Sequence, residues 1–332
     1  MDREPEEMQN LGFVEAYNEA YKLIVSCREL FSKIAASLIL PLSFLFLAQI
    51  QISYLIFAKI DTNVDALEKT VDGSSAQQRI MARLLSEWST YLLFKGVYLI
   101  GVLIFSLLST SAVVYTVACI YTAKDVSFRK ILTVVPKVWK RLMVTFLWSF
   151  LVLFIYNFIF LFILLIIVFG PGGSPIGIFL GIIIILLYFP GLIYISIVWH
   201  LASVVSVLED TYGIAAMQKS KNLIRGKDWV VALIYLFAQM TFIGVEFLFR
   251  NVVVHSTNSW FVVRLVYAAV ILAALTLVLL VVLVVQTVVY FICKSYHHES
   301  IDKSSLSDHL EVYMGEYVPL REKDVQLQQF DI

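Results

Sequence analysis

Six long stretches of almost entirely apolar residues alternate along the chain with shorter polar segments. Each has at least the roughly 20 residues that a helix needs to cross the hydrocarbon core of a bilayer. Because lipid offers no partner to an unpaired backbone group, we expect these stretches to be helices. They cover residues 34–57, 91–121, 142–169, 178–208, 230–249 and 261–293. The pattern predicts an all-α, polytopic membrane protein with six transmembrane helices.

The fifth and sixth stretches differ in how strongly they indicate a membrane span. Residues 265–285 carry no charged side chain. The fifth stretch contains Gln239 and Glu246, so a buried helix of a soluble core is the alternative for it.

Three polar segments that precede outgoing spans have a helical period of their own. In residues 13–31, apolar side chains share one face and Glu19 lies on the opposite face. Residues 128–142 repeat this pattern, with Pro136 bending the helix on its free side, and residues 216–224 repeat it more weakly. Helices with an apolar face and a cationic face lie in the membrane interface. We therefore expect about three in-plane amphipathic helices.

These helices suggest a repeat of three units, each an in-plane helix followed by two spans. The units are about 13–122, 126–208 and 213–293, within a single membrane domain at 13–293. The competing interpretation is that any transition from polar to apolar sequence looks amphipathic for a few residues. The acidic segment 1–12 is predicted to be disordered, and residues 294–332 form a polar tail with serines and tyrosines that are candidates for phosphorylation.

Basic residues are concentrated on one predicted side of the membrane. Most of the 25 Lys and Arg residues lie in the N-terminal segment, the second and fourth loops and the tail. Because cytosolic loops carry an excess of basic residues, we expect both termini to be cytosolic. The endoplasmic reticulum or another part of the secretory pathway is the expected location, and the plasma membrane is the alternative. Cys293 then lies at the cytosolic membrane edge, either as an unmodified thiol or as a palmitoylated one.

Composition excludes several other classes of protein. Of 332 residues, 60% are hydrophobic and 15% are charged, and the 25 acidic and 25 basic residues give no net charge. A neutral chain lacks the basic field that binds nucleic acid. The three cysteines are far apart, and no histidine pair has metal-ligand spacing, so we expect no disulfide framework, metal or cofactor. A lipid-processing enzyme built on His200, Glu209 and Asp210 is the weakest hypothesis, and we expect no enzymatic activity.

Two groups of charged residues are candidate sites. The polar face of residues 128–142 is a candidate contact for anionic lipid head groups or for a partner. It consists of Arg129, Lys130, Lys137, Lys140 and Arg141. Glu246, Arg250 and Arg264 form a candidate polar cluster at the outer ends of the last two spans, because Glu246 and Arg250 have the i, i+4 spacing of a helical ion pair. This cluster is either an interfacial group of ions or a gate.

The stretch from 200 to 229 has a distinctive order of acidic, small and aromatic residues. Its motif residues are Glu209, Gly213, Ser220, Gly226 and Trp229. Gly213 permits a sharp turn. The turn would place Glu209 and Asp210 near the positive end of the next helix dipole. We expect a structural role for these acids rather than a role in substrate binding.

This stretch and residues 38–44 resemble a plant family of uncharacterised six-span integral membrane proteins. The motif is also similar to the membrane domain attached to some bacterial glycerophosphodiester phosphodiesterases. The resemblance implies a six-span fold and supplies no catalytic residues. No segment outside the spans has the length of a catalytic barrel, about 200 residues or more, so phosphodiesterase activity is not implied.

The resulting functional hypothesis is a non-enzymatic multi-pass membrane protein that organises membrane or recruits partners at its cytosolic face. A transporter or channel for a small, fairly apolar molecule is the alternative. The expected partners are the bilayer, anionic head groups, and other membrane proteins or further copies of the chain, with no nucleic acid.

Overall fold

The computed structural model describes residues 11–70, 74–122, 127–170, 172, 174–255 and 260–297, except for the side chain of Lys137. Across these ranges every regular element is a helix. Most of the acidic segment 1–12, most of the tail 294–332 and part of the turn between the third and fourth spans lie outside the described residues.

Among the described residues, six helices are long and apolar enough to cross a membrane, which agrees with the predicted number of spans. Two short π-helical segments, η1 and η2, interrupt the α-helices. In chain order the elements are α2 (Phe13–Ser26), α3 (Arg28–Ile34), η1 (Ala35–Ile39), α4 (Leu40–Glu68), α5 (Ser75–Tyr121), α6 (Phe128–Phe169), α7 (Pro175–Leu208), α8 (Ile214–Ile224), α9 (Asp228–Phe249), η2 (Arg250–Val254) and α10 (Phe261–Tyr296).

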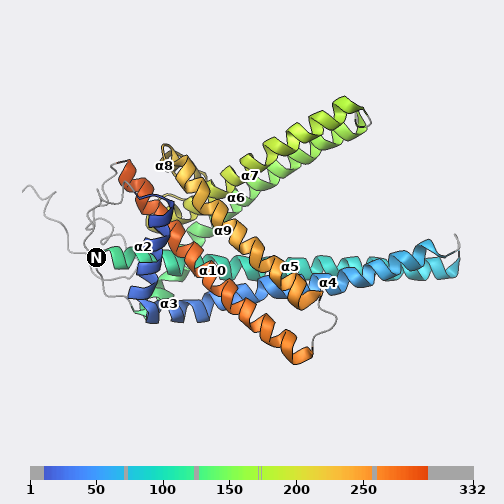
Figure 1. Ribbon diagram of the computed structural model, residues 1–332, viewed down its shortest axis with the longest axis horizontal. Coiled ribbons are helices and arrows are strands. Elements are labelled where there is room, and N and C mark those ends of the chain that lie inside the picture. The colour runs from blue at the N-terminus through green and yellow to red at the C-terminus, as the bar shows by residue number, and fades with distance from the viewer. Residues whose placement is uncertain are drawn as a thin grey trace, which may run out of the picture.

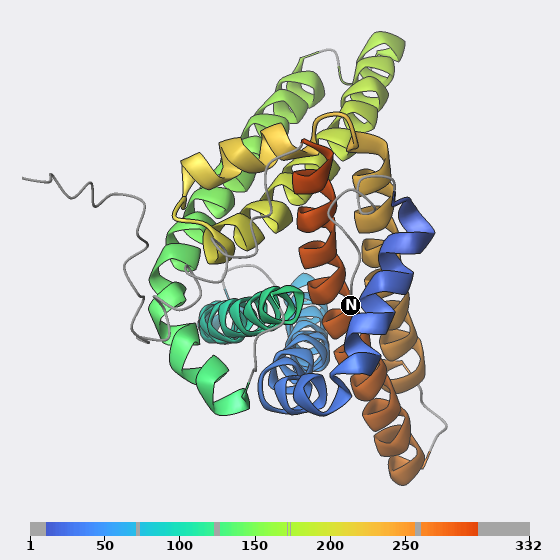
Figure 2. The ribbon, with the colours of Figure 1, turned by 90° about the vertical axis from the view of Figure 1, so that its left-hand side faces the viewer.

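The long helices form three hairpins that meet at one end of the molecule and diverge at the other (Figure 1). Helix α4 packs on α5, α6 on α7, and α9 on α10. We call the common end the hub; it consists of α2, α3, α8 and the adjoining ends of α5, α6, α7, α9 and α10. In the hub, Val117 of α5, Leu201 of α7 and Val288 of α10 are fully buried in one hydrophobic core. Both described ends of the chain lie at the hub (Figure 2).

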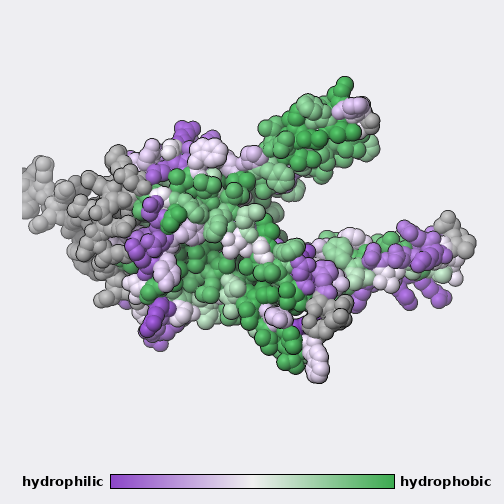
Figure 3. Space-filling model, viewed as in Figure 1, coloured by the Kyte–Doolittle hydropathy of each residue, from purple (hydrophilic) through white to green (hydrophobic). Residues whose placement is uncertain are grey.

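Outside the hub, the α6–α7 hairpin is covered by no other described element. The most apolar stretch of α6 has no buried residue, and large side chains such as Phe158 and Leu187 are more than half exposed. Figure 3 shows this hairpin as a projecting, almost wholly hydrophobic surface. An apolar surface of this extent requires an apolar environment. The uncovered hairpin is therefore consistent with an integral membrane protein.

The predicted helix over 13–31 is wrong in two details. It breaks at Cys27, which has φ −118° and ψ 40°, so that α2 and α3 are separate helices. Glu19, predicted on the polar face, is only 4% exposed. The physical reason is that α2 packs against both α9 and α10, which buries a wider arc of its surface than a single apolar stripe.

Residues 128–142 do not form a helix separate from the third span. Helix α6 continues through Pro136 without interruption and bends near its start (Figure 2). Ile131, Val135 and Val138 of these turns are buried in the hub, while Lys140 on the other face is exposed. The expected apolar and cationic faces are therefore present on the first turns of a longer helix.

The hairpin arrangement predicts which sites react from opposite sides of a membrane. In a Cys27→Ser background the remaining cysteines, Cys119 and Cys293, are buried and protected. We expect an impermeant maleimide to label Gln218→Cys at the hub and Gln78→Cys at the start of α5 from opposite sides of sealed vesicles. Labelling of both positions from the same side would contradict the hairpin arrangement.

Candidate functional site

The link between α7 and α8 forms a sharp turn inside the hub. Helix α7 ends at Leu208, and Glu209 adopts an extended conformation with φ −128° and ψ 164°. Gly213 has φ +67°, a conformation that L side chains rarely adopt. Because of this turn, α8 folds back along α7. The Gly213 N–H donates to Thr145 Oγ1 of α6 at 2.7 Å. This bond attaches the turn to α6, the helix that pairs with α7 in the same hairpin.

Buried hydroxyl groups fix the surroundings of this turn. Thr145 and Ser206 lie with their hydroxyl oxygens 2.7 Å apart, and both side chains are essentially inaccessible to solvent. Ser220 of α8 donates to the backbone carbonyl of Val198 in α7 at 2.9 Å. In a bilayer, hydroxyl groups of this kind provide helix-to-helix contacts that apolar packing alone does not.

The carboxylate of Glu209 joins three helices. Lys219 of α8 lies 2.6 Å from its Oε2, while Tyr290 and Lys294 of α10 donate to its Oε1 at 2.6 Å and 3.1 Å. The Glu209 side chain is only 13% exposed. We call Glu209, Lys219, Tyr290 and Lys294 the Glu209 junction. It connects the end of α7 to α8 and α10.

The charge state of Glu209 follows from these contacts. Burial on its own would raise the pKa of the Glu209 carboxyl. The hydrogen bonds from Lys219 and Tyr290 and the positive charge of Lys294 outweigh burial and hold the pKa below its ordinary value. Glu209 is therefore a stable carboxylate and a poor proton donor at neutral pH.

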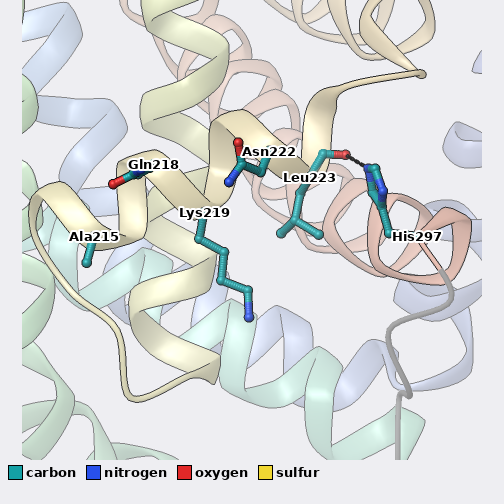
Figure 4. A pocket seen from close by; sticks show the side chains of 6 residues that line it. All are labelled: Ala215, Gln218, Lys219, Asn222, Leu223 and His297. Atoms are coloured by element: carbon teal, nitrogen blue, oxygen red, sulfur yellow. Dashed lines mark hydrogen bonds between the residues drawn. The ribbon is translucent and has the colours of Figure 1, made fainter.

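A polar depression of about 450 Å³ lies beside the junction on the surface of α8 (Figure 4). Its lining residues are Ala215, Gln218, Lys219, Asn222, Leu223 and His297. The His297 ring nitrogen Nε2 lies 3.1 Å from the Leu223 carbonyl, which ties the end of α10 to α8. The lining offers amide groups and one ammonium that is already paired with Glu209. Among the described residues no group of three His, Cys, Asp or Glu side chains could hold a metal ion.

The remaining motif residues lie at the end of α8 and the start of α9. Gly226 has φ +90°, and a Cβ atom there would lie 2.6 Å from the ring of Tyr296 in α10. Glycine is therefore required at this position by both conformation and space. Trp229 is 84% exposed, which suits an aromatic side chain at a membrane interface.

The predicted cationic group is only partly connected to this site. Arg141 pairs with Asp210 at 2.8 Å, so α6 also contacts the α7–α8 link. Arg129, Lys130 and Lys140 are exposed on the first turns of α6, and the side chain of Lys137 lies outside the described residues.

The three residues of the predicted polar cluster at the far end of the molecule do not all contact one another. Glu246 and Arg250 form the expected ion pair at 3.0 Å. Arg264 instead donates to the backbone carbonyl of Val253 in η2 at 2.6 Å. These residues lie at the opposite end of α9 from the Glu209 junction.

Sequence reasoning missed the partners of Glu209 and the role of Thr145. Tyr290 and Lys294 have i, i+4 spacing at the end of α10, a signal that could have been noticed, but nothing local connects them to residue 209. The structure also buries Cys293 completely, which removes the access that palmitoylation needs and favours the unmodified thiol. His200 stacks between Trp199 and Tyr235 rather than joining Glu209.

In the described part of the chain, the fold and this site define an all-helical protein with six helices suited to crossing a membrane, two of which, α7 and α10, meet α8 at a polar junction. More particularly, the chain belongs to the family described as "Domain of unknown function (DUF8558)", whose model matches residues 1–330. No curated protein and no solved structure matches the chain.

We predict that Glu209→Gln destabilises the protein by about 1.5–3 kcal/mol, because the charged hydrogen bonds from Lys219, Tyr290 and Lys294 are weakened. Thermal unfolding in detergent measures the change. Glu29→Gln is the control, since Glu29 also pairs with a lysine, Lys33 at 2.6 Å, but is 84% exposed. The control should leave the unfolding temperature unchanged. Equal effects of the two substitutions would contradict the special role of Glu209.

The lowered pKa of Glu209 predicts a specific loss of stability in acid. The pKa of this group is lower in the folded protein than its ordinary value of 4.5, so its contribution is fully present above about pH 4.5. It is lost as the pH falls through the folded-state pKa. The stability difference between the wild type and Glu209→Gln should therefore be constant near neutral pH and shrink in acid. A difference that grows as the pH falls would contradict the assignment.

Proposed function

We propose that this protein is a non-enzymatic, multi-pass membrane protein that organises the membrane around its hub. In this proposal the exposed cations at the start of α6 attract anionic head groups or an acidic partner. The observation that carries it is the divergence of three hairpins from a solid hub, with the α6–α7 hairpin left uncovered by other described elements. A spread set of hairpins contacts far more lipid than a closed bundle of the same helices.

The interior of the hub also supports an organising role over transport. Its largest fully buried side chains are aliphatic or aromatic, and the buried hydroxyls of Thr145, Ser206 and Ser220 lie within hydrogen-bonding reach of a neighbour. A carrier needs a path lined with groups that a solute can use. The alternative, a transporter or channel for a small apolar molecule, is favoured by one observation, a cavity of about 200 Å³ that Gln49, Tyr98 and Glu246 help to line.

The position of the cations supports an orientation with the hub in the cytosol. Arg129, Lys130 and Lys140 are exposed there, and cytosolic segments next to spans are rich in such residues. Both termini would then be cytosolic. The endoplasmic reticulum or the secretory pathway is our preferred location, with the plasma membrane as the alternative.

The three hairpins support the proposed threefold repeat. A shorter helical segment precedes each hairpin: α2 and α3 precede α4, the bent start precedes the rest of α6, and α8 precedes α9. The relation to plant six-span proteins and to the membrane domain of bacterial glycerophosphodiester phosphodiesterases stays a prediction.

Reversing exposed charges at the hub should weaken its preference for anionic lipid. We predict that Arg129→Glu with Lys140→Glu lowers the binding of phosphatidylserine relative to phosphatidylcholine by about 30-fold, because each basic residue near an anionic surface contributes about 1 kcal/mol and every 1.4 kcal/mol is tenfold. Quenching of tryptophan fluorescence by brominated lipids in reconstituted vesicles measures this preference.

The matched control is Arg79→Glu with Arg83→Glu, which makes the same change of charge on exposed residues at the other end of α5. This control should keep the preference of the wild type. High salt should reduce the wild-type preference toward that of the hub variant. An unchanged preference in the hub variant would count against the proposal, and net flux of an apolar solute through the purified protein would favour the transporter.

A further inference from the structure

A crevice of about 560 Å³ opens between α4 and the far end of the α9–α10 hairpin. This volume lies within the range of about 300–1,000 Å³ that is typical of sites for one small molecule. Its walls include Leu47 and Phe249, which belong to a second buried cluster, and the small side chains Ala48, Ala268 and Ala269 leave it hollow. The crevice is distinct from the hub and from the Glu209 junction.

The crevice is open along its rim. Three lining side chains, Phe44, Phe261 and Leu265, are exposed by 59%, 79% and 60%. They belong to helices that are long and apolar enough to cross a membrane. In a bilayer the opening therefore faces lipid, and a lipid can enter it sideways.

Two polar groups line the same crevice, and its apolar walls offer them no hydrogen-bond partners. Gln51 Oε1 is buried and has no hydrogen-bond partner in the described part of the chain. Arg264 donates to the Val253 carbonyl at 2.6 Å, while a guanidinium carries five N–H donors. A buried acceptor without a donor is unfavourable. The crevice therefore suits a ligand that brings a hydroxyl to Gln51 and an anion to Arg264.

We propose that this crevice binds a lysophospholipid, with its phosphate on Arg264, its free glycerol hydroxyl donating to the Gln51 amide, which turns Oε1 toward the crevice, and its single acyl chain in the hollow. Arginine binds phosphate through two parallel N–H···O bonds. A diacyl phospholipid has no free hydroxyl between phosphate and chains, and its second chain would have no place in the crevice. A fatty acid matches Arg264 and the hollow but brings no hydroxyl to Gln51.

The test uses the purified full-length protein in phosphatidylcholine nanodiscs and measures binding of oleoyl lysophosphatidic acid by native mass spectrometry. Oleate and dioleoyl phosphatidic acid are the comparison ligands. We expect lysophosphatidic acid to bind at least tenfold more tightly than either. Equal binding of oleate would make the crevice a fatty-acid site, and equal binding of the diacyl lipid would make it ordinary annular contact. Either result overturns the proposal.

Substitutions at three positions test the three contacts separately. Arg264→Gln should weaken binding of lysophosphatidic acid by roughly 10- to 100-fold, as expected for loss of a charge-assisted hydrogen bond, and Arg264→Lys should restore part of it. Gln51→Leu should weaken binding of lysophosphatidic acid and leave oleate unaffected. Ala269→Trp should fill the hollow and abolish binding of both ligands.

The control for the filling variant is Ala273→Trp, which adds the same side chain at an exposed position of α10 that does not line the crevice. It should bind like the wild type. If Ala269→Trp lowers the unfolding temperature, the Arg264 and Gln51 variants, which nearly preserve side-chain size, still decide the question. Wild-type affinity in both Arg264→Gln and Gln51→Leu overturns the proposal.

Discussion

The carboxylate of Glu209 is the one polar group on which the arrangement of the hub depends. It receives hydrogen bonds or ion pairs from α8 and α10 while it stands at the end of α7. Burial of apolar surface in the hub core has no preferred direction, whereas hydrogen bonds and ion pairs require a defined geometry. Polar contacts of defined direction therefore decide which helices meet. Around Glu209, the bonds from Gly213 to Thr145 and from Ser220 to Val198 serve the same purpose with neutral groups.

The division between a fixed hub and diverging hairpins follows from where such polar groups occur. The hub contains hydroxyls, the charged junction and two glycines with positive φ. The outer parts of α6 and α7 contain almost only aliphatic and phenylalanine side chains. Their contacts with each other include a hydrogen bond from Tyr188 to Asn157 at 2.7 Å, which holds the two helices together as a pair. The most apolar stretch of α6 has no buried residue, and large side chains of both helices are exposed there, so the pair stands apart from the other described elements outside the hub.

The sequence was sufficient to predict the features that depend on nearby residues alone. The number of spans follows from runs of apolar residues, and the exposed face of Arg129 and Lys140 follows from helical periodicity. Burial of Glu19 could not be predicted, because it depends on α9 and α10 covering α2 from both sides. The partners of Glu209 could not be predicted either, since Tyr290 and Lys294 are more than 80 residues away in the chain. The separate roles of Arg250 and Arg264 depend on the π-helical turn η2, which has no clear sequence signal.

The length of α5 has a mechanical consequence. Its 47 residues form one uninterrupted helix about 70 Å long, more than twice the thickness of a hydrocarbon core of about 30 Å. Asn63 of α4 donates to both carboxylate oxygens of Glu87 at 2.9 Å and braces this rod beyond its apolar part. The paired helices therefore form a rod that is too long for a hydrocarbon core to contain from end to end. Anything attached at the tip of this rod, near Ser75, is held at a set distance from the hub.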